Sequence, residues 1–390
     1  MSRLRACACL LLICLASYAA AQQDKRDEPV REQVAQHEYD LLSEGKVFLS
    51  DEARHASFFL LGELHGENEI PSLLRELWPG MWQDGYRYVA AELSPWAANQ
   101  LEFTPADRHA KLVTLWSKRE ALFVHSFGAG QDVLWGCDMD ELQPHLLIRD
   151  LAAANPANLN LAQMVGITKS GYKREMAPKL LQLARGLKST RDLSINDASL
   201  LGNVEATLEI ESARLNPDTK LQAQQRRESL MKELFLLHYQ KNMSSNPEAK
   251  VMVRFGRNHL HRGYDDRGIS TLGNFVAEFA VAQHKTVFNV AAFGAGGKAS
   301  FAGDAWDADE RSDDVAFAFL ASMARYPATV FDLRPLRQTS MTFLMRIGLP
   351  SNKGWSTGQI HTTRSSASKK LPLGIPNLLI TSHRFITFNQ

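Results

Sequence analysis

Two apolar runs in this chain are each closed by a Gly-x-x-His segment, and this pair constrains the fold more than any other feature. Phe58–Leu61 is followed by Gly62-Glu63-Leu64-His65, and Val251–Phe255 is followed by Gly256-Arg257-Asn258-His259. Short apolar runs are typical of buried strands, and a glycine after them allows a sharp turn or a close approach to a ligand. Two strands with a histidine just past each end predict one shared polar site.

Strand-like and helix-like segments alternate along the first part of the chain. Strands are predicted at Ala56–Leu61, Tyr86–Leu93 and Asp132–Cys137, and helices at Glu69–Trp82 and Asp107–Phe123. This β-α-β-α-β order is typical of a parallel sheet covered by helices. Helical spacing then dominates from about 142 to 245, including a helix at Leu221–Tyr239, so we expect a large helical insertion there.

The sheet pattern returns after the insertion and runs toward the C-terminus. The predicted elements are strand Lys250–Phe255, helix Ser270–His284, strand Thr286–Phe293, helix Asp314–Ala324 and strands Ala328–Leu333 and Asn377–Thr381. Phe293–Lys298 is rich in glycine but lacks the spacing of a phosphate-binding loop, so we expect a mobile loop at the sheet rim. We therefore predict one α/β domain at 51–390, preceded by a flexible lead-in and short helix at 22–50.

The N-terminus has the pattern of an export signal. Arg3 and Arg5 precede an apolar stretch, and Ala19-Ala20-Ala21 forms an A-x-A cleavage site before Gln22. We expect residues 1–21 to be cleaved and the mature protein to be periplasmic or secreted. A lipoprotein anchor at Cys14 is disfavoured because the bulky Ile13 precedes the cysteine. Three of the four cysteines leave with the signal, so Cys137 remains without an intramolecular disulfide partner.

Composition excludes several functions. Net charge is +1, with no basic stripe, so nucleic acid is not an expected partner. No later run reaches the roughly 18 apolar residues of a spanning helix, so we expect no transmembrane segment in the mature chain. The H-E-x-x-H zinc helix and the G-x-S-x-G nucleophile turn are both missing from the sequence. A small molecule or a peptide is the expected substrate.

Polar residues cluster at the predicted strand ends, where open parallel sheets bind their ligands. They are Glu63, His65, Glu92, Asp138, Asp140, Arg257, Asn258 and His259. For Glu92 and Asp138, pairing with a core arginine explains the buried acid as well as a catalytic role does. Asp140 is better explained as a helix N-cap, and Glu67 and Glu69 suit the start of a helix capped by Asn68. His261 is expected to face the surface.

These residues resemble the group of erythromycin esterases, ChaN-like haem-binding proteins and Tiki/TraB proteins. The likeness lies in Gly-Glu-x-His-Gly at 62–66, the acid Glu92, Gly-Cys-Asp at 136–138 and the late Gly-x-x-His at 256–259. It implies a three-layer α/β/α sandwich around a mostly parallel sheet. The chain departs from the esterase motifs in two places: it has one residue fewer between Glu63 and His65, and it has an arginine at 257. Both departures make its motifs more similar to those of ChaN and Tiki proteins, and they weigh against macrolide hydrolysis.

Three functions follow from this resemblance. In the esterase reading no cofactor is required: His65 acts as general base on water, Glu63 or Glu92 orients it, and Arg257 and His259 stabilise the oxyanion, with Asp138 nearby. In a Tiki/TraB-like peptidase, His65, His259 and Glu92 would hold a divalent metal ion. In a ChaN-like protein, haem would bind without catalysis and without covalent attachment. We favour the exported hydrolase.

Overall fold

The computed structural model describes residues 28–103, 118–127, 132–141, 143–187, 193–265, 267–301, 304–311, 315–338 and 378–382. Within these residues nine strands form a sheet of order β1-β8-β9-β6-β2-β5-β3-β4, with β7 paired to β6. Their bounds are β1 Glu38–Asp40, β2 Phe58–Glu63, β3 Tyr86–Ala91, β4 Leu134–Gly136, β5 Lys250–Gly256, β6 Val287–Phe301, β7 Asp304–Asp309, β8 Ala328–Asp332 and β9 Leu378–Ser382.

The centre of the sheet is parallel, as predicted. Strand β2 pairs in parallel with both β5 and β6, and β3 pairs in parallel with β4 and β5. Antiparallel pairs occur toward one edge, between β1 and β8 and between β8 and β9, and in the β6–β7 ribbon. In the pairing of β2 with β5, Glu63 lies opposite Gly256, so the two Gly-x-x-His segments leave the sheet side by side.

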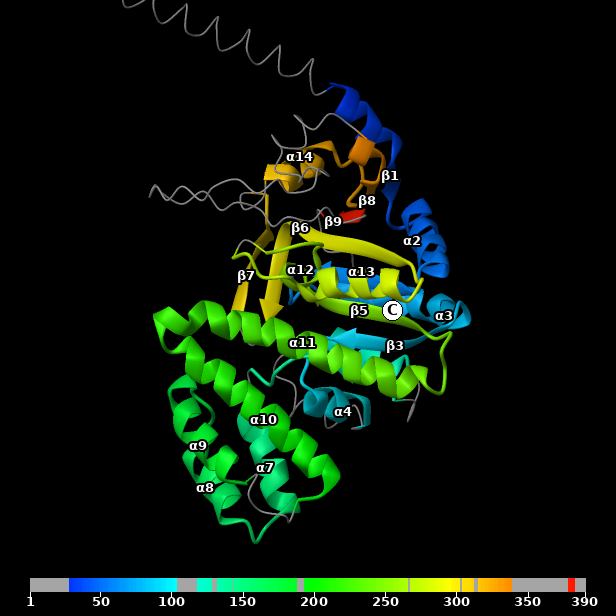
Figure 1. Cartoon of the computed structure of the whole chain (residues 1–390). Coiled ribbons are helices and arrows are strands. Elements are labelled where there is room, and N and C mark those ends of the chain that lie inside the picture. Colours follow the sequence, from blue (N-terminus) through cyan, green and yellow to red (C-terminus); the bar gives the residue numbers. More distant parts are fainter. Residues whose placement is uncertain are drawn as a thin grey trace, which may run out of the picture.

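Helices cover both faces of the sheet (Figure 1). Their bounds are α2 Glu44–His55, α3 Glu69–Gln83, α4 Pro95–Phe103, α6 Lys118–His125, α7 Pro144–Ala154, α8 Leu159–Ile167, α9 Ala177–Leu187, α10 Ile195–Arg214, α11 Lys220–Met243, α12 Arg257–Leu260, α13 Leu272–Ala282 and α14 Val315–Met323. Three 3₁₀ turns complete the described elements, at η1 Arg174–Met176, η2 Pro217–Thr219 and η3 Pro335–Gln338.

The alternation of side chains along β2 produces two cores. Phe59 and Leu61 point to the face covered by α2, α3 and α6, where they join a cluster that includes Trp78. Phe58 and Leu60 point to the opposite face, where α11 and α13 cover them. Because successive strand residues face opposite sides, an apolar run that is buried throughout requires a layer of helices on each side. The predicted three-layer α/β/α fold is therefore confirmed.

The helices between β4 and β5 form the predicted insertion. Helices α7 to α10 pack on one another through a separate apolar cluster, which also takes in Trp96 of α4. In Figure 1 these green helices lie together below the sheet, while α11 runs back across it. The last helix of the insertion thus belongs to the sheet core as well, through Met231, Phe235 and Tyr239.

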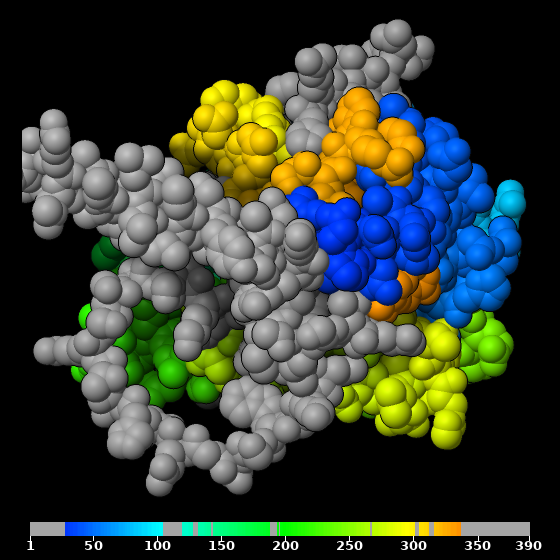
Figure 2. Space-filling model, turned by 90° about the horizontal axis from the view of Figure 1, so that it is seen from above, coloured from blue at the N-terminus to red at the C-terminus, as the bar shows by residue number. Residues whose placement is uncertain are grey.

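The other edge of the fold joins the start of the described chain to its later part. A helix over residues 28–36 places Val30 and Val34 against Phe317 and Leu320 of α14. Figure 2 shows this side, with the blue N-terminal residues lying against orange residues near 315–338. The antiparallel pairing of β1 with β8 fixes the same contact through the backbone.

Some sequence-based expectations need correction. Phe293–Lys298 is not a loop, because β6 continues through it to Phe301 and pairs with β7. Strands β1 and β7 were not predicted. The expected helix at Asp107–Phe123 falls partly outside the described residues, and its described part belongs to α6, which begins at Lys118. Among the described helices, none combines the length and the apolar character needed to cross a bilayer.

Candidate functional site

A cavity of about 370 Å³ lies at the carboxyl ends of the central strands. Its wall is formed by the residues that follow β2, β3 and β4, together with side chains from β5, α6 and α11. The lining residues are Glu63, His65, Gly66, Glu67, Ala91, Glu92, Leu93, Ser94, Ala97, Glu120, Asp138, Met139, Asp140, Glu141, Arg227, Arg254 and Ser300. Of the polar strand-end residues singled out in the sequence, Glu63, His65, Glu92, Asp138 and Asp140 lie in this lining.

Both motif glycines are needed for close approach. A Cβ on Gly256 would lie 3.1 Å from Nε2 of His65 and 3.2 Å from Oε2 of Glu92. With no side chain there, the amide of Gly256 donates to Oε2 of Glu92 over 2.7 Å. A Cβ on Gly62 would lie 3.0 Å from Cα of Arg257, so this glycine lets α12 start directly against β2. The paired glycines therefore bring backbone and site together.

His65 lies between two carboxylates. Its Nδ1 is 3.2 Å from Oε1 of Glu63, and its Nε2 is 3.1 Å from Oε2 of Glu92. Burial disfavours the charged ring, but the Glu92 carboxylate and the hydrogen bonds to Glu63 and Glu92 outweigh it, and they raise the pKa of His65 to about 10. At neutral pH the ring is therefore an imidazolium that donates from both nitrogens.

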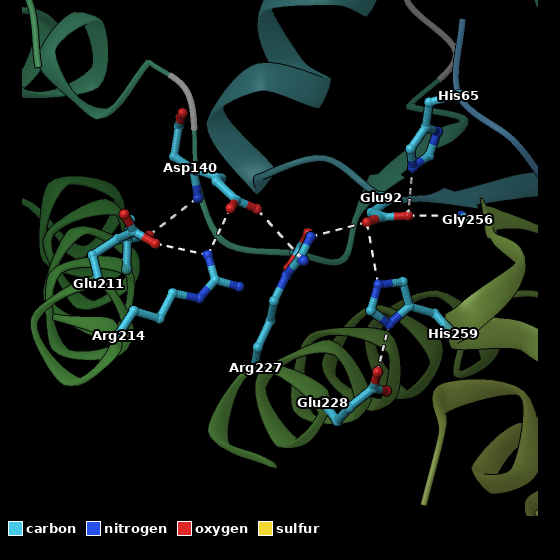
Figure 3. Close-up of polar contacts among 12 residues, drawn as sticks. His65, Glu92, Asp140, Glu211, Arg214, Arg227, Glu228, Gly256 and His259 are labelled. Carbon is cyan, nitrogen blue, oxygen red and sulfur yellow. Dashed lines mark hydrogen bonds and ion pairs between the residues drawn. The ribbon is translucent and has the colours of Figure 1, made fainter. Parts of the chain in front are cut away.

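Glu92 lies at the centre of the site and contacts four of its residues (Figure 3). Its Oε1 accepts from Nη2 of Arg227 at 2.9 Å and lies 3.4 Å from Nε2 of His259. Its Oε2 takes the contacts from His65 and Gly256. Burial alone would raise the pKa of this carboxyl, but His259, His65 and Arg227 together hold it well below its ordinary value. Glu92 is thus a fixed anion between two imidazoles.

Arg254 and Arg227 pair with three further carboxylates of the site. Arg254 of β5 donates to both oxygens of Glu63, at 2.8 and 3.1 Å, and pairs in the same way with Glu120 of α6. Arg227 of α11 donates to both oxygens of Asp138. Burial tends to raise the pKa of Glu63, yet Arg254 and His65 bring it below its ordinary value. Both arginines are bidentate partners, which fix carboxylate orientation.

The structure separates the predicted site residues into two groups. His65, Glu63, Glu92 and Asp138 line the cavity. His259 lies behind Glu92 and is not part of the lining, since its Nδ1 contacts Glu228 and its Nε2 faces Glu92.

Arg257 points away from the cavity. It pairs with Glu310, donates to the carbonyl of Ala292, and lies over the ring of Phe293 with Cζ 4.0 Å from the ring centroid. The next residue, Asn258, is exposed and is not among the residues that line the cavity. Within the second Gly-x-x-His segment, His259 therefore contacts Glu92, whereas Arg257 contacts β6 and Glu310.

Other expectations for individual residues are corrected. His261 is not at the surface: it is 9% exposed, and its Nδ1 contacts the carbonyl of Arg257. Asp140 does not occupy the N-cap position of α7, which belongs to Gln143. Its carboxylate accepts from Ser94 at 2.9 Å and from the amide of Gln143 at 3.2 Å, and burial raises its pKa to about 6.

Glu67 is also a residue of the cavity, although its sequence context suited helix capping. Burial and the neighbouring Glu310 raise its pKa to about 8. A Cβ on Gly294 would lie 2.7 Å from Oε1 of Glu67, so this glycine makes the space that the carboxyl fills. Asn68 occupies the N-cap position before α3, but its side chain makes no capping hydrogen bond.

Sequence reasoning missed the two arginines, Glu120 and Glu228. Arg254 did carry a signal, because a charged residue inside the apolar run Val251–Phe255 must find a buried partner. Arg227 and Glu228 carried none, since each lies in a helix rich in charged and polar residues far from the strand ends.

The arrangement of the described donor atoms does not match a metal site. Among the described residues, no group of three or more histidine, cysteine or acidic side chains is arranged to hold one. The trio His65, His259 and Glu92 is brought together, but both imidazole Nε2 atoms face the same carboxylate, whose oxygens Arg227 and Gly256 also occupy.

Comparison with solved structures shows what fold this is. The chain is similar to a Bacillus cereus protein (TM-score 0.58, 13% identity, 91% of this chain and 97% of the other). It is similar to a mutant of the erythromycin esterase EreC in its open conformation (TM-score 0.57, 13% identity, 86% and 93%). A succinoglycan biosynthesis protein also matches (TM-score 0.55, 14% identity, 91% and 96%). No protein-family model and no curated protein matches.

These likenesses define the class at the level of the fold. The chain has the α/β fold that the erythromycin esterase also has, as its motifs predicted. The haem-binding ChaN of Campylobacter jejuni matches with a TM-score of 0.31 over 63% of this chain, which is too low to support an argument. At sequence identities of 13–14%, the feature that this chain shares with these proteins is the fold.

Proposed function

We propose that the protein is a hydrolase that cleaves an ester-type bond in the cavity. The observation that carries this proposal is the position of His65, an imidazole at the cavity wall held at both nitrogens by fixed carboxylates. An oriented imidazole with a buried carboxylate partner is the arrangement that activates water in acyl transfer. The fold shared with an erythromycin esterase supports this reaction class.

The mechanism depends on which hydrogen bond of the His65 ring can break during the reaction. Glu63 is locked from behind by Arg254, so it keeps Nδ1 of His65 in place. Nε2 faces Glu92 across 3.1 Å, so this contact must open before Nε2 can exchange a proton with water. The water oxygen attacks the acyl carbon as its proton passes to neutral Nε2, and the resulting imidazolium returns the proton to the leaving alcohol.

The developing oxyanion needs a donor at the cavity wall. Arg227 lines the cavity, whereas Arg257 does not. Nε and Nη2 of Arg227 are used by Asp138 and Glu92, while its Nη1 lies 3.5 Å from Glu141. This leaves Nη1 the best-placed group to donate to an oxyanion, so Arg227 takes the role that the sequence had suggested for Arg257.

The test is hydrolysis of a panel of aryl and alkyl esters by the wild type, His65→Ala and the control His55→Ala. His55 is exposed, and its ring contacts only its own helix. We expect His65→Ala to lose about 10²- to 10⁴-fold in kcat with the fold intact, and His55→Ala to lose nothing. Equal rates in the wild type and His65→Ala would refute the proposal.

The pH profile gives a second readout. Because the base must be neutral and the pKa of His65 is about 10, kcat/KM should rise with pH through the neutral range. Glu63→Gln removes one of the carboxylates that stabilise the imidazolium and should move this rise to lower pH. Elemental analysis and absorbance of the same samples decide whether a metal-dependent or haem-binding reading must replace the hydrolase.

A further inference from the structure

The last helix of the insertion supplies two consecutive charged residues to the site. Arg227 of α11 reaches the cavity, where it pairs with Asp138 and Glu92. Glu228, the next residue, is 2% exposed and is not among the residues that line the cavity. A buried carboxylate is costly unless it is paired, so the partners of Glu228 should explain its presence.

Glu228 has two partners. Oε1 accepts from Nδ1 of His259, and Oε2 accepts from the amide of Leu272 at 3.0 Å. In Figure 3 Glu228 lies on the far side of the His259 ring from Glu92. Since a hydrogen bond at one ring nitrogen decides which tautomer and orientation the ring adopts, the contact at Nδ1 directs Nε2 toward Glu92, 3.4 Å away.

The arrangement repeats on the other side of Glu92. There Glu63 holds Nδ1 of His65, and Nε2 of His65 faces the second oxygen of Glu92. Two carboxylate–imidazole pairs, Glu63 with His65 and Glu228 with His259, therefore flank one carboxylate. Only the first pair lines the cavity. The second pair therefore acts on the reaction through Glu92, the residue that it contacts.

We propose that Glu228 is a positioning residue, which orients His259 so that Glu92 is held in place for His65. This inference rests on the proposed hydrolase function. It gives α11 a role in setting the reactive geometry, beyond covering the sheet. The contrasting role is purely structural, with Glu228 serving only to anchor the first residue of α13 through the amide of Leu272.

The test uses Glu228→Leu, Glu228→Gln and the control Glu233→Gln. Glu233 lies on the same helix, but it is exposed and pairs with Arg226 at 2.9 Å. Kinetics on the best ester substrate are combined with proton–nitrogen NMR of histidine-labelled protein, in which the His259 ring signal is assigned with His259→Gln. The NMR readout needs no activity, so it reports on Glu228 even if no ester is hydrolysed.

We expect Glu228→Leu to lose the Nδ1–H signal of His259 and about tenfold or more in kcat, with KM within about twofold. Glu228→Gln keeps an acceptor oxygen, so it should shift that signal and restore part of kcat. If Glu228→Leu does not fold, Glu228→Gln decides alone. A folded Gln variant with an unchanged ring signal and unchanged kcat, or with only a lower melting temperature, would overturn the proposal.

A wild type that hydrolyses no ester would refute the proposed function, and the ring spectrum would then decide on Glu228 by itself. Glu233→Gln should match the wild type in both readouts. A loss of kcat in this control as large as that of Glu228→Gln would show that any charge change on α11 disturbs the site, and would overturn the specific role of Glu228.

Discussion

Replacing Arg254 by methionine tests the electrostatic account of the site most directly. Arg254 is 5% exposed and contacts Glu63 and Glu120, whose side chains are 7% and 13% exposed. Methionine fills similar space but carries no charge. The variant would take away the guanidinium that Glu63 and Glu120 share and would leave the His65 imidazolium as the cation beside Glu63.

The size of the effect can be worked out from this geometry. Removing one partner of a buried ion pair typically costs about 3–5 kcal/mol, because the other charge stays buried. Since Arg254 serves two carboxylates, we expect a loss of unfolding free energy at the upper part of that range, about 4–5 kcal/mol at pH 7. The double variant Arg254→Met/Glu120→Gln removes one orphaned charge and should recover about 2 kcal/mol.

The pH dependence has a definite sign. Removing the guanidinium raises the folded-state pKa of both carboxyls relative to wild type, so the variant loses stability relative to wild type as pH rises. The loss relative to wild type should therefore be smaller at pH 5 than at pH 7. Urea unfolding followed by tryptophan fluorescence measures it. A loss under about 1 kcal/mol, or an equal loss at both pH values, would refute the reasoning.

Two further predictions concern stability. Gly66 has φ of +95°, and a Cβ there would lie 2.5 Å from the carbonyl oxygen of Ser300, so Gly66→Ala should cost about 1–3 kcal/mol. Gly80→Ala in α3 meets nothing within 4 Å and should be neutral or stabilising; matched denaturation curves with equal losses would contradict this. Because the folded pKa of Glu67 is about 8, against about 4.5 unfolded, wild-type stability should fall between those pH values. Glu67→Gln should therefore gain about 2–5 kcal/mol over wild type at pH 9 and little at pH 5, and thermal melts showing a pH-independent difference would exclude this.

Much of the fold could be predicted because buried parallel strands appear in the sequence as short, continuous apolar runs. Runs such as Phe58–Leu61 and Val251–Phe255 are apolar on both faces, and only a two-sided burial explains them. Strand β7, Asp304–Asp309, has no apolar run and forms by pairing with the extension of β6. The glycines in that extension favour a loop locally, and the partner strand overrides that preference.

The site was predictable only where residues follow strands. Glu63, His65 and Glu92 were found because parallel strands end at one edge. Arg227 and Glu228 reach the site from α11, and no rule of spacing connects a helix at 220–243 with a strand end at 92. The role expected of Arg257 was wrong for the opposite reason. It lies close to His259 in sequence, but its side chain points to Glu310.

The order in which the charges occur along the chain has a consequence for how the protein is made. The carboxylates Glu63, Glu92, Glu120 and Asp138 all precede residue 140, whereas Arg227, Arg254 and His259 come after 220. During synthesis these acids therefore emerge with His65 but before the arginines that pair with them in the folded protein. The paired charges of the site can therefore assemble only after α11 and β5, which carry Arg227 and Arg254, have been synthesised.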